Sequence, residues 1–270
     1  VTGFGDDWVV KRLTRSGRRP WALLALGPVL ALAAACGSGP SAPAAPSQAV
    51  GTKLDGPLKP AISALPLRTS TGATTTLAAY AGKVVVISDS MTLCQESCPL
   101  DTTNIVEAAR AVNRAGLADK VVFLTISVDP GRDTTARLAA YRKFYAAPGQ
   151  LPNWVLLTGR AADIDALWKY FGVFWKKVGP DKGATDWMTG KPLTYDVTHS
   201  DDVFFVDEHQ HERFLISGMA MVRKGTIPSA LQSFLNTEGR QNMEHPQAGS
   251  WTVDQLLQTV SWLTGRHVAG

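Results

Sequence analysis

Three uninterrupted apolar runs divide the middle of the chain. They are rich in Val, Ile and Leu, and they cover residues 84–88, 121–128 and 154–158. Continuous β-branched runs of this length are typical of strands that are covered on both faces. The pattern therefore predicts three strands, of which at least the first two are buried.

Segments with helical periodicity follow these runs. After Pro99, apolar side chains fall at positions i, i+3, i+4 and i+7, namely Ile105, Ala108, Ala109 and Val112. A second helix is expected to begin at Asp133, as its cap, and to run to about residue 147, with Leu138, Tyr141 and Tyr145 facing inward. A third helix is expected over residues 162–170.

Two hairpins and a last helix complete the pattern. Strands at 203–207 and 212–216 bracket a turn with His209 and His211, and Thr71-Gly72 marks the turn of a shorter hairpin. Thr252 and Gln255 have the spacing of a capping box that opens a helix over 252–264. This order of elements predicts an α/β fold, with a mixed central sheet and helices on both faces.

Charge is concentrated at the beginning of the chain. The 270 residues have a formal net charge of +4, with 27 basic and 23 acidic residues. Residues 1–35 hold five of the basic and two of the acidic residues, so 36–270 hold 22 and 21. A nearly neutral body argues against nucleic acid as a partner.

The first 35 residues have the layout of an export signal. A basic segment precedes the apolar run from Trp21 to Ala35, which is short for a membrane span, and Cys36 follows directly. Small residues before this cysteine resemble a bacterial lipobox, which predicts lipidation of Cys36; cleavage near Ala35 by an ordinary signal peptidase is the alternative. We therefore expect an exported lipoprotein, anchored to the outer face of the cytoplasmic membrane.

Residues 36–59 are expected to form a flexible linker. Of the 14 residues from Gly37 to Val50, 12 are Gly, Ser, Pro or Ala, and such a segment cannot bury much apolar area. The folded domain is expected to cover residues 60–270, with no assignment for an excursion at about 218–250.

Two cysteines stand just after the first apolar run. Pro99 has no N–H to donate and must lie in the first turn of its helix, so Cys98 is expected at the helix N-terminus and Cys94 in the preceding loop. The helix dipole would lower the thiol pKa there and favour a thiolate. A thiolate serves equally in disulfide exchange and as a ligand for a soft metal. A structural disulfide is a third reading, weakened because closing so short a loop removes little chain entropy.

An ordered set of motifs resembles the Sco/SenC family. Cys94-x-x-x-Cys98-Pro99 is followed by TISVDPGRDT (125–134), LWKYFGVFWKKV (167–178) and TYDVTHSDDVFFVDE (194–208), in the order and approximate spacing of that family. The resemblance covers residues 60–217 and implies a thioredoxin-like fold with inserted hairpin and loops.

The resemblance also implies a function. The family's copper ligands map onto Cys94, Cys98 and His199, a soft donor set suited to Cu(I) that an added ligand could extend to Cu(II). The implied activity is delivery of copper to the dinuclear copper centre of cytochrome c oxidase, with the copper-containing oxidase subunit or another copper chaperone as partner. The alternative is a thiol–disulfide oxidoreductase that keeps the partner's cysteines reduced, for which Cys94 and Cys98 would form a disulfide when oxidised.

The chain departs from the family pattern in two places near the site. Thr198 stands where the family commonly has Asp before its histidine, and Ser88-Asp89-Ser90 replaces the usual aromatic residues before the cysteines. Asp196, close to Thr198, is a candidate for a carboxylate that orients the ligands. Asp129 is expected mainly to form the turn after its strand, with orientation of the site as the second interpretation.

Overall fold

An eight-stranded mixed sheet forms the centre of the part of the chain that the computed structural model describes, residues 41–147 and 149–270. The strand order is β1-β10-β9-β4-β5-β6-β2-β3, and β7 and β8 pair in a separate two-stranded sheet. The export signal expected at 1–35 and the lipidation site Cys36 lie outside the described residues. No helix among the described residues is long and apolar enough to cross a membrane.

The three apolar runs form the parallel centre of this sheet. They are β4 (Val84–Ser90), β5 (Val121–Ser127) and β6 (Trp154–Gly159), and β5 pairs in parallel with both neighbours. On the other side of β4, the expected hairpin is confirmed as β9 (Asp202–Val206) and β10 (His211–Ser217), with β9 antiparallel to β4. The shorter hairpin is also confirmed, as β2 (Leu67–Thr69) and β3 (Thr74–Thr75).

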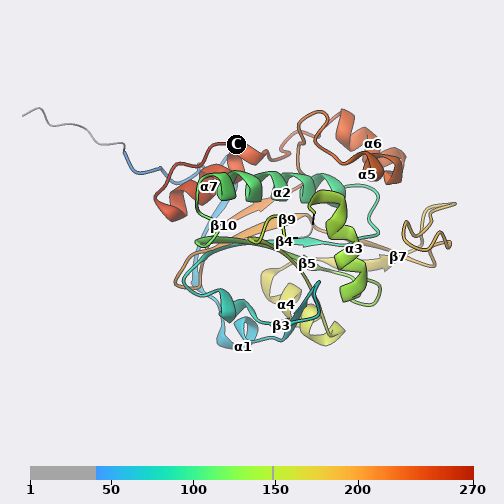
Figure 1. The fold of residues 1–270 in the computed structure, drawn as a ribbon, viewed down its shortest axis with the longest axis horizontal. Coiled ribbons are helices and arrows are strands. Elements are labelled where there is room, and N and C mark those ends of the chain that lie inside the picture. The colour runs from blue at the N-terminus through green and yellow to red at the C-terminus, as the bar shows by residue number, and fades with distance from the viewer. Residues whose placement is uncertain (1–40, 148) are drawn as a thin grey trace, which may run out of the picture. The chain divides into compact units, whose positions relative to one another are not determined.

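Helices cover both faces of the sheet, as Figure 1 shows. On one face lie α2 (Cys98–Arg114), α3 (Thr135–Tyr145) and α7 (Val253–Thr264), and on the other lie α1 (Pro60–Ser63) and α4 (Ala161–Phe171). A 3-10 turn, Leu77–Tyr80, leads toward β4. Successive side chains of β4 point to opposite faces of the sheet. Val84 and Val86 pack in the core on the α2 side, and Val85 and Ile87 pack in the core on the α4 side. The arrangement confirms the predicted α/β, thioredoxin-like fold.

The helix N-termini test the predicted caps. Thr252 and Gln255 form the predicted capping box of α7. The predicted cap of α3 is wrong by one residue: the Thr134 side chain accepts the hydrogen bond from Arg137 N, and Asp133 is buried. Asp133 instead accepts hydrogen bonds from Thr92 Oγ1 and Ser127 Oγ, both at 2.6 Å.

Part of the expected linker is folded. Residues Thr52–Pro57 form β1, which pairs antiparallel with β10 and completes that edge of the sheet. The composition of residues 37–50 suggested a tether that continued to residue 59, but the strand begins soon after that composition ends.

The excursion at 218–250 also has a definite structure. It contains two short helices, α5 (Ser229–Phe234) and α6 (Thr237–Glu244), which lie beyond the N-terminal end of α2 in Figure 1. Leu231 and Leu235 are buried in the same core as α2 and α7, so this segment is part of the domain.

Candidate metal centre

The loop of residues 91–97, here called the cysteine loop, joins β4 to α2 and carries Cys94. Cys98 is the first residue of α2 and Pro99 the second, as the proline predicted. The N–H of Cys98 donates to Cys94 Sγ at 3.2 Å, so the two cysteines face each other across the first turn. Both are buried, and both are free thiols in this structure.

The third donor comes from the separate hairpin of β7 (Trp175–Val178) and β8 (Asp196–His199). His199 is the last residue of β8, and its Nε2 lies 3.2 Å from Cys98 Sγ. One donor atom from each of Cys94, Cys98 and His199 falls within 4.8 Å of the other two. The structure thus brings together the three residues that the sequence singled out.

Asp89 orients the histidine, a role that sequence analysis assigned to other carboxylates. Its Oδ2 lies 2.6 Å from His199 Nδ1, and its Oδ1 accepts the N–H of Asp202 at 2.8 Å. A proton held on Nδ1 between Asp89 and the carbonyl of Ser200 leaves Nε2 facing Cys98. The sequence did hold one signal for this role, a carboxylate near the end of an apolar run that predicts a buried strand. A buried Asp requires a hydrogen-bond or charge partner.

The histidine and its carboxylate shift each other's pKa. Burial lowers the pKa of His199, but the hydrogen bond with Asp89, the Cys94 thiol and the Asp89 charge outweigh burial and raise it well above its usual value. Burial raises the pKa of Asp89, and His199 partly offsets that effect. The raised pKa favours the protonated ring, which carries a proton on both nitrogens, so a metal ion that binds Nε2 must displace the proton there.

The predicted lowering of the thiol pKa is wrong for this structure. Burial raises the pKa of Cys98, and burial together with the neighbouring Cys98 thiol raises the pKa of Cys94 well above its usual value. The helix N-terminus is present as expected, but desolvation of a buried thiolate dominates over the dipole. A cation that takes both sulfurs must displace their protons.

The two carboxylates proposed from the sequence lie farther out. Asp129 pairs with Arg132 and accepts a hydrogen bond from Tyr195 Oη at 2.9 Å, so it organises the loop after β5. Asp196 accepts the N–H of Val197 at 2.7 Å and lies 3.9 Å from an Arg132 nitrogen. Asp196 lines the cavity beside the donors, whereas Asp129 does not.

A cavity of about 300 Å³, here called the metal pocket, opens over Cys94 and His199. Among the described residues that line it, none is Lys or Arg and five are acidic: Glu96, Asp181, Asp196, Asp201 and Glu238. The Cys94 thiol lies 3.6 Å from a Glu96 carboxylate oxygen. Two sulfurs and one imidazole form a soft, low-coordinate donor set of the kind that binds Cu(I), and the acidic lining favours approach of a cation.

Comparison with known proteins agrees with these features. The SCO1/SenC family model matches residues 60–224, more than half of the 270-residue chain. The chain is 27% identical over 122 residues to the human mitochondrial protein SCO1 homolog, an alignment that covers 45% of this chain and 38% of that protein. Alignments to the curated relatives cover 36% to 54% of their lengths, so the chain spans about half of them or less.

A solved structure supports the fold. A SCO1/SenC family lipoprotein from Bacillus anthracis has a TM-score of 0.50 at 23% identity, over 68% of this chain and 97% of that one. ScoI from Bradyrhizobium japonicum, solved with copper bound, has a TM-score of 0.45 at 25% identity over the same shares of the two chains. Because the family model matches more than half of the chain, this chain belongs to the SCO1/SenC family.

Proposed function

We propose that this chain binds copper as cargo through Cys94, Cys98 and His199 and delivers it to the dinuclear copper centre of cytochrome c oxidase. The observation that carries the proposal is the convergence of these three donors within 4.8 Å, from the loop and helix after β4 and from the separate β7–β8 hairpin, in a chain of the SCO1/SenC family. Two thiolates and a neutral imidazole nitrogen are the donor types that suit Cu(I).

The surroundings of the donors suit uptake and release. The acidic residues of the metal pocket attract a cation, while burial of both thiols keeps them protonated until the ion arrives. The pocket is open at one side, so an acceptor with its own thiol or imidazole groups can reach the ion and take it by ligand exchange. The oxidase subunit that holds the copper centre, or another copper chaperone, is the partner that this proposal requires.

The test of the metal site uses His199→Ala, with His209→Ala as the matched control. His209 is exposed in the turn between β9 and β10 and is not among the residues that line the metal pocket. We expect the purified wild type and His209→Ala to bind one Cu(I) each, with closely similar affinity. His199→Ala should lose affinity, measured by competition with a chromophoric Cu(I) chelator. Retention of full affinity in His199→Ala would overturn the proposal.

A thiol–disulfide oxidoreductase is the second candidate, because two free thiols lie close together and one of them, Cys94, lines the metal pocket. It would need Cys94 and Cys98 but not His199 as a ligand. Rapid disulfide exchange with a reduced or oxidised client, unchanged in His199→Ala, would favour this function. Slow exchange in a protein whose copper affinity depends on His199 would favour delivery.

We also propose that the mature protein is exported and anchored at the outer face of the cytoplasmic membrane through lipid on Cys36. The support is the sequence of residues 21–36, an apolar run that ends in small residues and a cysteine. Mass spectrometry of protein from the membrane fraction should find a diacylglyceryl group on Cys36. Cys36→Ser should move the protein to the soluble fraction, and an unmodified cysteine in membrane-bound wild type would contradict the anchor.

A further inference from the structure

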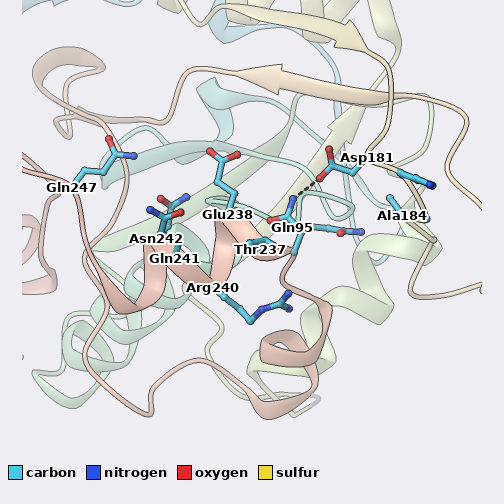
Figure 2. Close-up of a pocket in the computed structure, with 12 residues that line it drawn as sticks. Gln95, Asp181, Ala184, Thr237, Glu238, Arg240, Gln241, Asn242 and Gln247 are labelled. Atoms are coloured by element: carbon cyan, nitrogen blue, oxygen red, sulfur yellow. Dashed lines mark hydrogen bonds between the residues drawn. The ribbon is translucent and has the colours of Figure 1, made fainter.

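A second and larger cavity lies along α6, next to the cysteine loop. Its volume is about 680 Å³, within the range of cavities that bind small molecules or short chain segments. In Figure 2, Gln247 lies at one end of the lining, Asn242 and Glu238 of α6 lie in the middle, and Gln95 and Asp181 lie toward the other end. We call this cavity the carboxamide groove, because five carboxamide side chains line it: Gln95, Asn236, Gln241, Asn242 and Gln247.

The carboxamide groove continues into the metal pocket. Asp181, Glu238 and Asn242 line both cavities, and Cys94 and His199 line the metal pocket. Most of the groove comes from residues 236–247, which lie beyond residues 60–224, where the family model matches. A ligand that fills the groove would therefore reach the metal donors from the side formed mostly by residues 236–247. The family model does not match these residues.

The carboxamides of the lining have the chemistry of a polypeptide backbone, and they lie beside two acidic and two basic side chains, Asp181, Glu238, Lys182 and Arg240. A carboxamide offers both an N–H₂ donor and a carbonyl acceptor, the same two groups that every non-proline residue of an extended chain must satisfy. Gln241 and Gln247 are exposed at the groove surface, and Gln95 is partly exposed. A row of such side chains can pair with a strand-like segment without requiring particular side chains on it.

One buried amide in the groove lacks a partner. Asn242 is only 5% exposed, and its Nδ2 makes no hydrogen bond within the described part of the chain. A buried donor without an acceptor costs about 1–3 kcal/mol. Because Nδ2 itself has almost no exposed surface, the Asn242 side chain must turn toward the groove before a carbonyl oxygen of a bound segment can supply the acceptor there.

The groove is firmly attached to the cysteine loop. The N–H of Asn236 donates to the Gln95 carbonyl at 3.2 Å, and its side-chain Nδ2 donates to Glu96 and, at 2.9 Å, to Asp181. A segment held by α6 would therefore keep a fixed position relative to Cys94, which reduces the ordering cost at the moment of transfer.

We propose that the carboxamide groove binds an extended polypeptide segment of the protein that exchanges copper with this chain, through the segment's backbone and with basic side chains toward the acidic metal pocket. The role in copper exchange rests on the proposed copper function, whereas the binding of a peptide to the groove does not. It assigns α6 and the cysteine loop a part in choosing the partner.

The first experiment measures binding without copper. The probe is a fluorescein-labelled heptapeptide, Lys-Ser-Gly-Ser-Gly-Ser-Lys, titrated with metal-free, reduced protein and followed by fluorescence anisotropy. We expect saturable binding, weakened several-fold by Gln241→Ala combined with Gln247→Ala, and about tenfold or more by Asn242→Asp, which turns a donor into an acceptor. Gln258→Ala, which removes an exposed carboxamide from α7, should leave the dissociation constant unchanged.

Two variant probes test which chemistry is recognised. The same peptide with methylated backbone nitrogens should bind more weakly, because it cannot donate to the carboxamide oxygens. The peptide with Glu in place of both Lys should also bind more weakly, because the metal pocket is acidic. No binding of the parent peptide at millimolar concentration, or equal binding of all three, would overturn the proposal. Because Gln241 and Gln247 are exposed, their variant should fold even if Asn242→Asp does not.

The second experiment measures copper transfer to Lys-Cys-Gly-Ser-Gly-Cys-Lys. In the Gln241→Ala, Gln247→Ala variant, the peptide concentration at half-maximal rate should rise several-fold, while the maximal rate stays unchanged. An equal half-saturating concentration in variant and wild type would contradict the groove. If the protein binds no copper, the copper function fails, yet the anisotropy experiment still decides whether the groove binds a peptide.

Discussion

Asp89 illustrates how a residue that touches no metal can set the geometry of a metal site. It is the last residue but one of β4, a strand on which all seven residues are buried, and its two oxygens hold His199 Nδ1 and the N–H of Asp202. The sequence identified Cys94, Cys98 and His199 because their types and motifs are distinctive. A carboxylate in a buried strand indicated that Asp89 has a partner, but not that the partner is His199, because the pairing spans 110 positions.

Replacing this carboxylate should weaken copper binding without removing a donor. For Asp89→Asn we expect a loss of about 10- to 100-fold in Cu(I) affinity, because the amide no longer fixes the imidazole tautomer. Competition with a chromophoric chelator measures the loss, and Asp165→Asn on the exposed side of α4 is the control. An unchanged affinity in Asp89→Asn would mean that the hairpin alone positions His199.

We expect the ionisation of Asp133 to make the stability of the fold depend on pH. Burial raises its pKa from 3.8 to about 6, although Ser127 and Thr92 donate hydrogen bonds to it. Because the folded state holds this proton more tightly than the unfolded state, the contribution of Asp133 is complete below about pH 4 and is lost as pH rises through 6. The shift corresponds to about 3 kcal/mol of unfolding free energy.

Urea unfolding of the reduced, metal-free protein at several pH values tests this. Asp133→Asn cannot ionise, so its unfolding free energy should fall less than that of wild type between pH 4 and 7. Parallel pH profiles for the two proteins would show that Asp133 does not titrate in this range.

At the scale of elements, α6 and the cysteine loop meet at a contact that tolerates no side chain. A Cβ on Gly239 would lie 2.0 Å from the Gln95 carbonyl oxygen, a backbone atom that cannot move without moving the loop. The loop carries Cys94, so the packing of a helix from the far end of the chain reaches the metal pocket directly.

Gly239→Ala should therefore affect both stability and copper binding. We expect a loss of about 1–3 kcal/mol in the free energy of unfolding, the usual cost of overpacking, together with weaker Cu(I) binding. Gly56→Ala is the control, because a Cβ there would meet nothing within 4 Å. Loss of stability with unchanged Cu(I) affinity would show that the cysteine loop does not follow α6.

The elements that the sequence predicted are those with a strong local pattern. The apolar runs, the amphipathic α2 and the capping box of α7 each have a period or motif that local physics explains. By contrast, β1 and α6 are polar and short, and tertiary contacts stabilise them: β1 pairs with β10, and Leu235 is buried just before α6. No local rule could place them. Likewise, the thiol pKa depends on burial, which a motif does not reveal.

At the scale of the whole domain, β1 protects one edge of the main sheet. It pairs with β10, whose Phe214 and Ile216 are buried in the core. An unpaired β10 would present free backbone groups next to apolar side chains, which is a template for association. The few residues before the family-matched region thus complete the fold rather than only connecting it.

Removing this strand should destabilise the domain and promote association. We expect a protein that begins at Leu58 to unfold at a lower temperature than one that begins at Ser41, and to scatter more light on heating. Circular dichroism and static light scattering measure the two effects. Equal melting temperatures would show that β10 is stable as an edge strand.

The three donors come from two parts of the fold, so a bound ion would hold these parts together. Cys98 stands at the start of α2 and His199 ends the β7–β8 hairpin, 101 positions later, so one ion would tie the hairpin to the main sheet like a removable crosslink. Binding to the folded state alone stabilises that state by mass action. The protein would then be most rigid while it carries its cargo, and handing the ion over would loosen the hairpin that had just presented it.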